Sequence, residues 1–309
     1  MILKSMVPAR SDTDGQASGN ALAAIGLACL AGLFFVSLNS LVKYLTGTID
    51  TVMIIWARYF FHVVTAIVLF PGTVVAITRV TQQKVHLARS LMLLLSTVFN
   101  FIALIFMPLG EVSAIIFTSP LIVAALAMVL LREKVSPTRW AVIVLGFTGT
   151  LLVVQPGMSG FNIGALLALG CAGAYAAYQV STRIVRESEP MVSLLYGGLV
   201  GMVVFSLIVP WFWQWPTWQQ WILLVLIGSF GAIGHLFMIM ALQRSEVSKV
   251  SPFTYLQLVW AMGSSIFFFG DIPNTLTIIG ALVIVASGLL LLNLDHGRAA
   301  RRLRRDQGA

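Results

Sequence analysis

Charged residues are scarce in this sequence. Only 10% of its 309 residues are Asp, Glu, Lys or Arg, whereas 59% are hydrophobic, and the mean hydropathy is +0.95. A soluble domain carries about 25% charged residues. Too few polar groups remain to cover a water-facing surface, so we expect lipid to surround much of the chain.

Other features are missing as well, and each absence excludes a class of protein. The two cysteines, Cys29 and Cys171, lie in apolar stretches, where small buried helix residues are expected rather than a disulfide. No Gly-rich phosphate-binding loop of the ATPase type is present, so an ATP-driven pump is not expected. No Cys/His cluster indicates a metal site, and no cofactor is expected.

The two ends of the chain are polar. Residues 1–20 predict a disordered cytoplasmic tail, and residues 295–309 form a basic tail that we expect to lie against anionic membrane lipid. The net charge of +8 is dispersed over this tail and the helix ends. We therefore do not expect a nucleic-acid partner.

Long apolar stretches fill the rest of the chain. About 20 apolar residues in a helix cross the hydrocarbon core of a bilayer. The sequence predicts ten such spans, near residues 21–44, 51–73, 88–107, 111–131, 138–155, 162–185, 190–212, 218–242, 248–270 and 275–294. With both termini in the cytoplasm, every basic residue of the 19 except Lys43 and Arg58 falls on the cytoplasmic side, as the positive-inside rule requires. This pattern predicts a multi-pass protein of the inner (plasma) membrane.

The second half of the sequence repeats features of the first. Glu-Val-Ser occurs at 111–113 and again at 246–248, and Phe-Thr follows at 117–118 and at 253–254. Five spans is an odd number, so the second copy would enter the membrane upside down, as in many secondary transporters. The predicted fold is an all-α integral membrane protein with ten transmembrane helices as two inverted five-helix repeats, 21–156 and 161–294. Chance similarity between apolar helices is the alternative.

Several short motifs resemble those of a known family, the EamA branch of the drug/metabolite transporter superfamily. They are WARY at 56–59, MPLGEVSAIIFTSP at 107–120, LREK at 131–134, GFTG at 146–149, AYQVSTR at 177–183 and ALQRSEVS at 241–248. The resemblance implies a fold of two five-helix halves and transport of a small metabolite. Members carry amino acids, nucleobases, vitamins such as riboflavin, S-adenosylmethionine or drugs, so the resemblance leaves the substrate open.

Arg58 is the most informative single residue, because a charge inside a span is costly and must face protein or water. It is a candidate for anion binding or gating. Alternatively, Arg58 is a structural charge that pairs with Glu111 or stacks on Trp56 or Tyr59.

The remaining candidates are neutral polar and aromatic side chains within the spans. His235 aligns with Asn100 by the Glu-Val-Ser register, and it is the one deep candidate for a coupling proton; a neutral interhelical role is equally open. The candidate substrate-binding residues are Asn100, Thr118, Ser119, Tyr175, Tyr178, Gln179, His235, Tyr255 and Gln257. For each of them, plain helix packing is the competing interpretation.

These features favour a secondary transporter of a small organic metabolite, with an amino acid or an amino-acid-derived metabolite as the favoured substrate. A vitamin or nucleotide-like metabolite, such as riboflavin or S-adenosylmethionine, is the alternative. A membrane-embedded lipid-modifying enzyme is a remote third hypothesis, since no catalytic constellation is visible. Export or uptake, coupling to a proton and a homodimeric state are left open.

Overall fold

The structure is a computed structural model that describes residues 14–72, 83–119, 121–123, 126, 137–155, 162–184, 190–244 and 255–306. Within these ranges the chain forms ten α-helices and one short 3-10 helix. They are α1 (Asp14–Leu45), α2 (Thr51–Leu69), α4 (Gln83–Phe106), α5 (Leu109–Ile116), α7 (Pro137–Val154), α8 (Ile163–Ile184), α9 (Pro190–Ile208), η2 (Val209–Phe212), α10 (Trp218–Arg244), α12 (Leu256–Phe269) and α13 (Thr275–Asp306).

Six of the helices contain segments long and apolar enough to cross a membrane by themselves. These segments are Leu22–Leu45, Thr51–Leu69, Gln83–Phe106, Ile163–Ser181, Met191–Phe212 and Trp218–Ala241. Shorter apolar helices cover Trp140–Val154, Leu256–Phe269 and Thr275–Leu290. The predicted helical, multi-pass membrane protein is therefore confirmed at this level.

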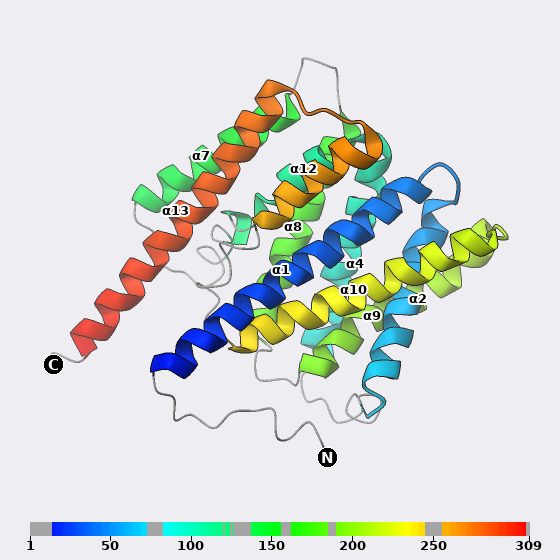
Figure 1. The fold of residues 1–309 in the computed structure, drawn as a ribbon, viewed down its shortest axis with the longest axis horizontal. Coiled ribbons are helices and arrows are strands. Elements are labelled where there is room, and N and C mark those ends of the chain that lie inside the picture. The colour runs from blue at the N-terminus through cyan, green and yellow to red at the C-terminus, as the bar shows by residue number, and fades with distance from the viewer. Residues whose placement is uncertain are drawn as a thin grey trace.

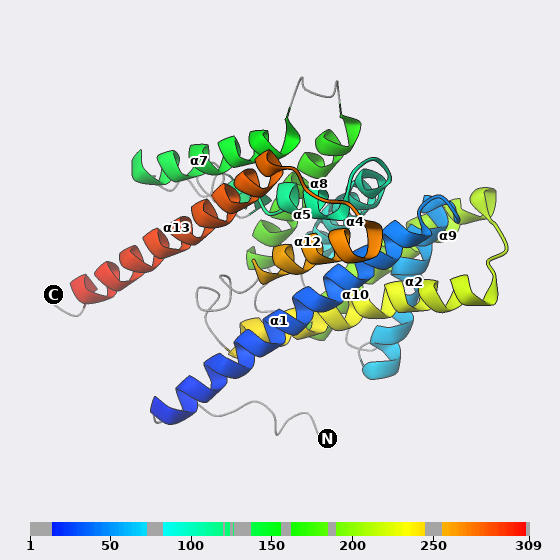
Figure 2. The same ribbon diagram turned by 45° about the horizontal axis from the view of Figure 1, so that its top comes forward.

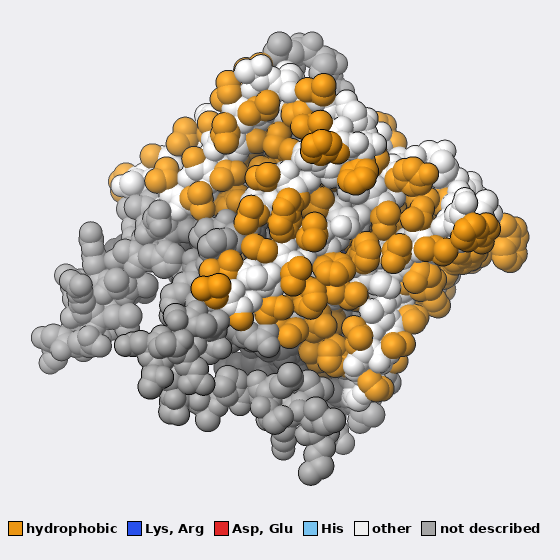
Figure 3. Space-filling model, viewed as in Figure 1, with side chains coloured by type: hydrophobic (Ala, Val, Ile, Leu, Met, Phe, Trp, Pro, Cys, Tyr) orange, Lys and Arg blue, Asp and Glu red, His pale blue; other side chains and the backbone are white. Residues whose placement is uncertain are grey.

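The surface of the bundle is apolar. Hydrophobic side chains spread over the face seen in Figure 3 and cover most of its described part. Several large ones are almost fully exposed, among them Phe267 at 86% and Trp215 at 85%. A soluble monomer rarely exposes a contiguous apolar surface of this extent, and lipid is the solvent that suits it.

The helices pack in neighbouring pairs that are distant in the sequence (Figures 1 and 2). α1 lies along α10, α4 along α8, and α7 along α13, while α2 packs against both α9 and α10. α1 begins and α13 ends at the same end of the bundle, the lower left of Figure 1. We call this end the termini side and the opposite end, with the turns 46–50 and 270–274, the far side.

Local signals in the sequence explain how the far-side turns begin and end their helices. The Asp50 carboxylate accepts a hydrogen bond from the Val52 backbone N–H at 2.8 Å and so caps the start of α2. Gly270 has φ +70° and ends α12, and its N–H donates to the Ile266 carbonyl. Glycine adopts this left-handed conformation without a steric penalty.

One predicted span differs from the structure. The sequence predicts a span over 111–131 that contains Pro120, but α5 ends at Ile116 with Phe117 as its C-cap, and helical residues resume at Ser119 and 121–123 after a turn at 117–118. The Thr118 hydroxyl donates to the Ile115 carbonyl at 2.7 Å, which offers the backbone an alternative to continuing the helix. Pro120, which lies outside the described residues, has no backbone N–H to donate, and proline is tolerated in the first turn of a helix rather than in its interior.

Candidate functional site

Arg58 lies inside the bundle, on the face of α2 that packs against α9 and α10. It follows the start of α2 by seven residues, about 10 Å at 1.5 Å per residue. Its side chain is only 4% exposed. The guanidinium donates a hydrogen bond from Nη1 to His62 Nδ1 at 2.9 Å and lies 5.4 Å from the centre of the Tyr59 ring.

These contacts fix the protonation of His62. A guanidinium has donors only, so His62 Nδ1 must be the acceptor and carry no proton. The other ring nitrogen, Nε2, then donates to the Leu194 carbonyl of α9 at 3.2 Å. Both nitrogens of His62 are occupied, and the imidazole holds Arg58 in place as a neutral group.

Gly231 of α10 allows the guanidinium to approach. A Cβ atom at position 231 would collide with the Cζ, Nη1 and Nη2 atoms of Arg58. The missing side chain therefore makes the space in which the charged group lies against the helix backbone. This contact makes α10 part of the same site as α2.

His235 completes what we call the arginine–histidine cluster, which consists of Arg58, His62 and His235. Its ring centre lies 5.9 Å from that of His62 and 5.0 Å from that of Phe35 on α1. His235 is partly exposed, in contrast to the fully buried His62. Among the described residues, no hydrogen bond to its ring nitrogens is found.

A second group, of two partly exposed tyrosines and a buried arginine, lies between α4, α8 and α9. The rings of Tyr175 and Tyr178 stack at 5.7 Å with an interplanar angle of 19°. The Arg89 guanidinium lies 5.3 Å from the centre of the Tyr178 ring and donates to the Ser193 carbonyl at 2.6 Å. Arg89 donates to the Ser193 carbonyl and His62 donates to the adjacent Leu194 carbonyl, so α9 brings the two groups into one region of the bundle interior.

The other candidates from the sequence make contacts typical of helix packing. Asn100 donates to Asn39 Oδ1 on α1 at 2.9 Å rather than meeting His235. Thr118 and Ser119 donate to backbone carbonyls, those of Ile115 and Ala172. These hydroxyls satisfy main-chain groups at the break after α5.

Tyr255 and Gln257 lie at the start of α12. Tyr255 is buried, its ring lies 5.3 Å from that of Phe117, and its hydroxyl has no hydrogen-bond partner among the described residues. Gln257 is partly exposed and lies beside Gly32 of α1. Gln179 is partly exposed on α8.

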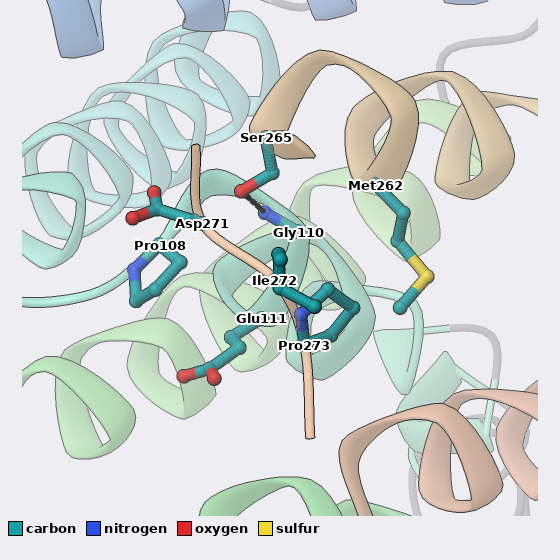
Figure 4. Close-up of a pocket in the computed structure, with 8 residues that line it drawn as sticks. All are labelled: Pro108, Gly110, Glu111, Met262, Ser265, Asp271, Ile272 and Pro273. Carbon is teal, nitrogen blue, oxygen red and sulfur yellow. Dashed lines mark hydrogen bonds between the residues drawn. The ribbon is translucent and has the colours of Figure 1, made fainter. Parts of the chain in front are cut away.

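Glu111 lies in a different place, at the far side. Figure 4 shows a pocket there, between α5, α12 and the turn that follows α12. It is lined by Pro108, Gly110, Glu111, Met262, Ser265, Asp271, Ile272 and Pro273. We call it the far-side pocket. Arg58 contacts His62 and Tyr59, so Glu111 is not its partner.

Lys43 also lies at the far side, in the last turn of α1. Its ammonium group donates to the carbonyls of Leu104 and Met107 at 2.7 and 2.9 Å. These carbonyls belong to the C-terminal end of α4, where a positive charge is favourable. Lys43 therefore joins two helix ends.

Sequence reasoning identified Arg58 and His235 and offered the stacking of Arg58 on Tyr59 as an alternative, which the structure shows, but it missed His62 and Arg89. His62 lies four residues after Arg58, on the same helix face, and this spacing could have revealed it. Tyr59 donates from its hydroxyl to Thr97 Oγ1 at 2.7 Å. Arg89 was assigned to the cytoplasmic end of its span, yet its side chain is 2% exposed, and no sequence signal distinguishes it from a loop arginine.

A membrane-spanning helical bundle with polar groups enclosed in its interior defines a transport protein. The model of the EamA-like transporter family matches residues 22–155 and again 162–293. The chain therefore belongs to the EamA-like transporter family, as the motifs predicted. The family and the relatives described below are transporters and not enzymes. The remote hypothesis of a membrane-embedded lipid-modifying enzyme is therefore wrong.

Transporters that are named for different substrates are similar to this chain. The S-adenosylmethionine uptake transporter of Rickettsia conorii is 26% identical over 81% of this chain and 85% of its own length. The riboflavin transporter of Vibrio cholerae is 26% identical over 63% and 66%, and the pseudopaline exporter of Pseudomonas aeruginosa is 25% identical over 88% and 96%. A solved crystal structure matches 94% of this chain and 99% of its own with a TM-score of 0.60 at 21% identity, which shows the fold alone.

Proposed function

We propose that this protein is a secondary transporter that moves a small organic metabolite by alternating access between two inverted halves. The observation that carries the proposal is that both halves build the interior site. Arg58 and Arg89 come from the first half, and Tyr175, Tyr178 and His235 come from the second. A site between two halves is opened to either side when the halves rock against each other.

The pairing of helices supports two equivalent halves. Let each helix of the first half correspond to one of the second half: α1 to α8, α2 to α9, α4 to α10 and α7 to α13. When the halves are exchanged in this way, the contact between α1 and α10 becomes the contact between α8 and α4, which is also present. The contact between α2 and α10 becomes that between α9 and α4, while α2–α9 and α7–α13 map onto themselves. An inverted repeat requires this kind of exchange.

An amino acid or an amino-acid-derived metabolite is the favoured substrate. Stacked tyrosines offer a flat apolar surface, and guanidinium and imidazole groups offer hydrogen-bond donors beside it. A planar vitamin or a nucleotide-like metabolite, such as riboflavin or S-adenosylmethionine, is the second candidate, since relatives are named for these compounds. The candidate binding residues are His235, Tyr175, Tyr178, Gln179, Asn100, Gln257, Tyr255, Thr118 and Ser119, with Arg58 and Glu111 as gating or structural charges.

The proposal includes a membrane orientation. The termini side faces the cytoplasm, with the tails 1–20 and 295–309 there and the halves 21–156 and 161–294 in the inner membrane. Positive residues concentrate at that side in the sequence. His235 is the candidate for carrying a coupling proton, and a homodimer is compatible with the apolar surface.

The first test measures ligand binding to the purified protein in detergent. A ligand present at 100 times its Kd stabilises the folded state by about 2.7 kcal/mol, which raises the melting temperature. We expect at least one compound among amino acids, S-adenosylmethionine and riboflavin to do so, and to be taken up by proteoliposomes that contain the protein. His235→Ala should abolish the shift, whereas Phe267→Ala, on the exposed surface, should preserve it. Uptake equal to that of empty liposomes for every compound would contradict the proposal.

A further inference from the structure

The charge of Arg58 has no counter-charge among the residues that the structure describes around it. Its contacts are a neutral imidazole, a tyrosine ring and the backbone at Gly231. No carboxylate lies among its contacts in the part of the chain that the structure describes. A guanidinium has five N–H donors, and one hydrogen bond to His62 leaves the others available.

A buried, uncompensated charge inside a membrane protein is costly and is retained where function requires it. The surroundings of Arg58 are built to keep the charge in place rather than to neutralise it. His62 is locked by hydrogen bonds on both nitrogens, and position 231 has no side chain that would displace the guanidinium.

His235 lies next to this charge and provides a second polar group. Its ring is held between Phe35 and His62, it is partly exposed, and its nitrogens make no hydrogen bond to any described residue. A ligand that binds the Arg58 guanidinium could therefore also form a hydrogen bond with an imidazole nitrogen of His235.

We infer that Arg58 binds a carboxylate of the transported metabolite, with His235 as the neighbouring hydrogen-bonding group. The planar guanidinium matches a carboxylate with two parallel hydrogen bonds. A carboxylate carries one negative charge and balances the charge of Arg58. This inference rests on the proposed function and names the chemical class of its substrate.

The experiment compares ligands that differ only in the carboxylate. Binding to the detergent-purified protein is measured for S-adenosylmethionine against decarboxylated S-adenosylmethionine, and for a panel of L-amino acids against their amides. Riboflavin serves as a planar ligand without a carboxylate. We expect the carboxylate form of at least one pair to bind tenfold or more tightly than its partner, since a hydrogen bond to a charged group supports a difference of that order.

Three variants assign this preference to Arg58. Arg58→Gln should bind both members of the pair equally, and Arg58→Lys should retain part of the preference, because it keeps the charge without the planar fork. Lys43→Gln is the matched control, which removes a positive charge at the far side and should keep the full preference. The melting temperature without ligand shows whether each variant is folded, and the comparison in the unmodified protein does not depend on any variant.

The outcomes separate the inference from the proposed function. Equal binding of both members of every pair, or a folded Arg58→Gln protein that keeps the preference, would overturn the inference. Binding of riboflavin alone would overturn the inference and leave a metabolite transporter. If no compound in the panel binds, the result would contradict both the inference and the proposed function.

Discussion

Two regions of the molecule hold charge in opposite ways. In the arginine–histidine cluster the cation of Arg58 is buried, and every group that touches it is neutral. In the far-side pocket the carboxylates of Glu111 and Asp271 are partly exposed at a helix end and a turn. A charge at the end of the bundle is stabilised by water and helix ends, whereas a charge in the interior must be held by specific contacts.

The comparison assigns different roles to the two regions. The cluster keeps a charge in the bundle interior through specific contacts of the Arg58 side chain with α2 and α10. The far-side pocket joins α5 to α12, and there the Gly110 N–H donates to the Ser265 hydroxyl at 3.3 Å. We therefore expect substitutions in the cluster to affect transport and stability strongly, and those at the far side to have small effects.

The largest effect is expected from Gly231→Ala. The new Cβ would collide with the Arg58 guanidinium, which is the end of a flexible side chain and must move away from His62, and loss of a hydrogen bond to a charged group costs about 1.5–3 kcal/mol. The melting temperature should fall and transport should be lost. Gly26→Ala is the control, because no atom lies within 4 Å of a Cβ at position 26; equal stability of the two variants would contradict the packing described for α2 and α10.

The next effect concerns Asn100, which is a packing residue or part of the binding site. Asn100→Leu removes the donor to Asn39 and should cost about 1–2 kcal/mol, because a partly buried amide loses its partner. Asn39→Leu/Asn100→Leu should recover much of this stability. Ligand binding by the double variant then decides the role: affinity equal to that of the unmodified protein would leave Asn100 as a packing residue only.

The sequence alone predicted the class of fold and part of the site. Span length and the basic residues at helix ends were sufficient to predict the helices, because bilayer thickness and the positive-inside rule constrain these features directly. The motifs, such as that at 107–120, were sufficient to predict the family. Arg58 and His235 stood out because polar groups inside spans are costly. The contacts of His62 with Leu194 and of Arg58 with Gly231 could not be predicted, because they join helices more than 130 residues apart in the chain.

The break after Ile116 shows a second limit of sequence reasoning. Apolar residues flank the break on both sides, so averaged hydropathy predicts a single span over 111–131. Hydrogen bonds of Thr118 to the Ile115 carbonyl and from the Leu121 N–H to the Thr118 carbonyl decide where the helix stops. Such local competition for backbone groups is invisible to a hydropathy window.

A smaller effect is expected from Tyr59→Phe, which keeps the ring beside Arg58 and removes only the hydroxyl. The lost hydrogen bond to Thr97 should cost about 1 kcal/mol, while the preference for ligands should persist because the guanidinium stays in place. Tyr44→Phe, at an exposed position, is the matched control and should leave the melting temperature unchanged. A change of ligand preference in Tyr59→Phe would mean that the hydroxyl itself contacts the ligand.

The smallest effect is expected at the far side. Glu111→Gln and Asp271→Asn remove charges that are partly exposed, and each should change stability by less than about 0.5 kcal/mol. Transport by both variants should remain close to that of the unmodified protein. A loss of transport in Glu111→Gln, with unchanged melting temperature, would instead give Glu111 a gating role.

The central claim, a ligand site at the arginine–histidine cluster, is tested most directly by protection of a cysteine placed there. Phe35→Cys, next to the His235 ring, and, separately, the exposed control Phe267→Cys are made in a background with Cys29→Ala and Cys171→Ala, and the rate of alkylation is measured with and without each compound that raises the melting temperature. We predict that such a compound slows alkylation at position 35 and not at position 267. Equal alkylation rates at position 35 with and without a bound compound would contradict the account.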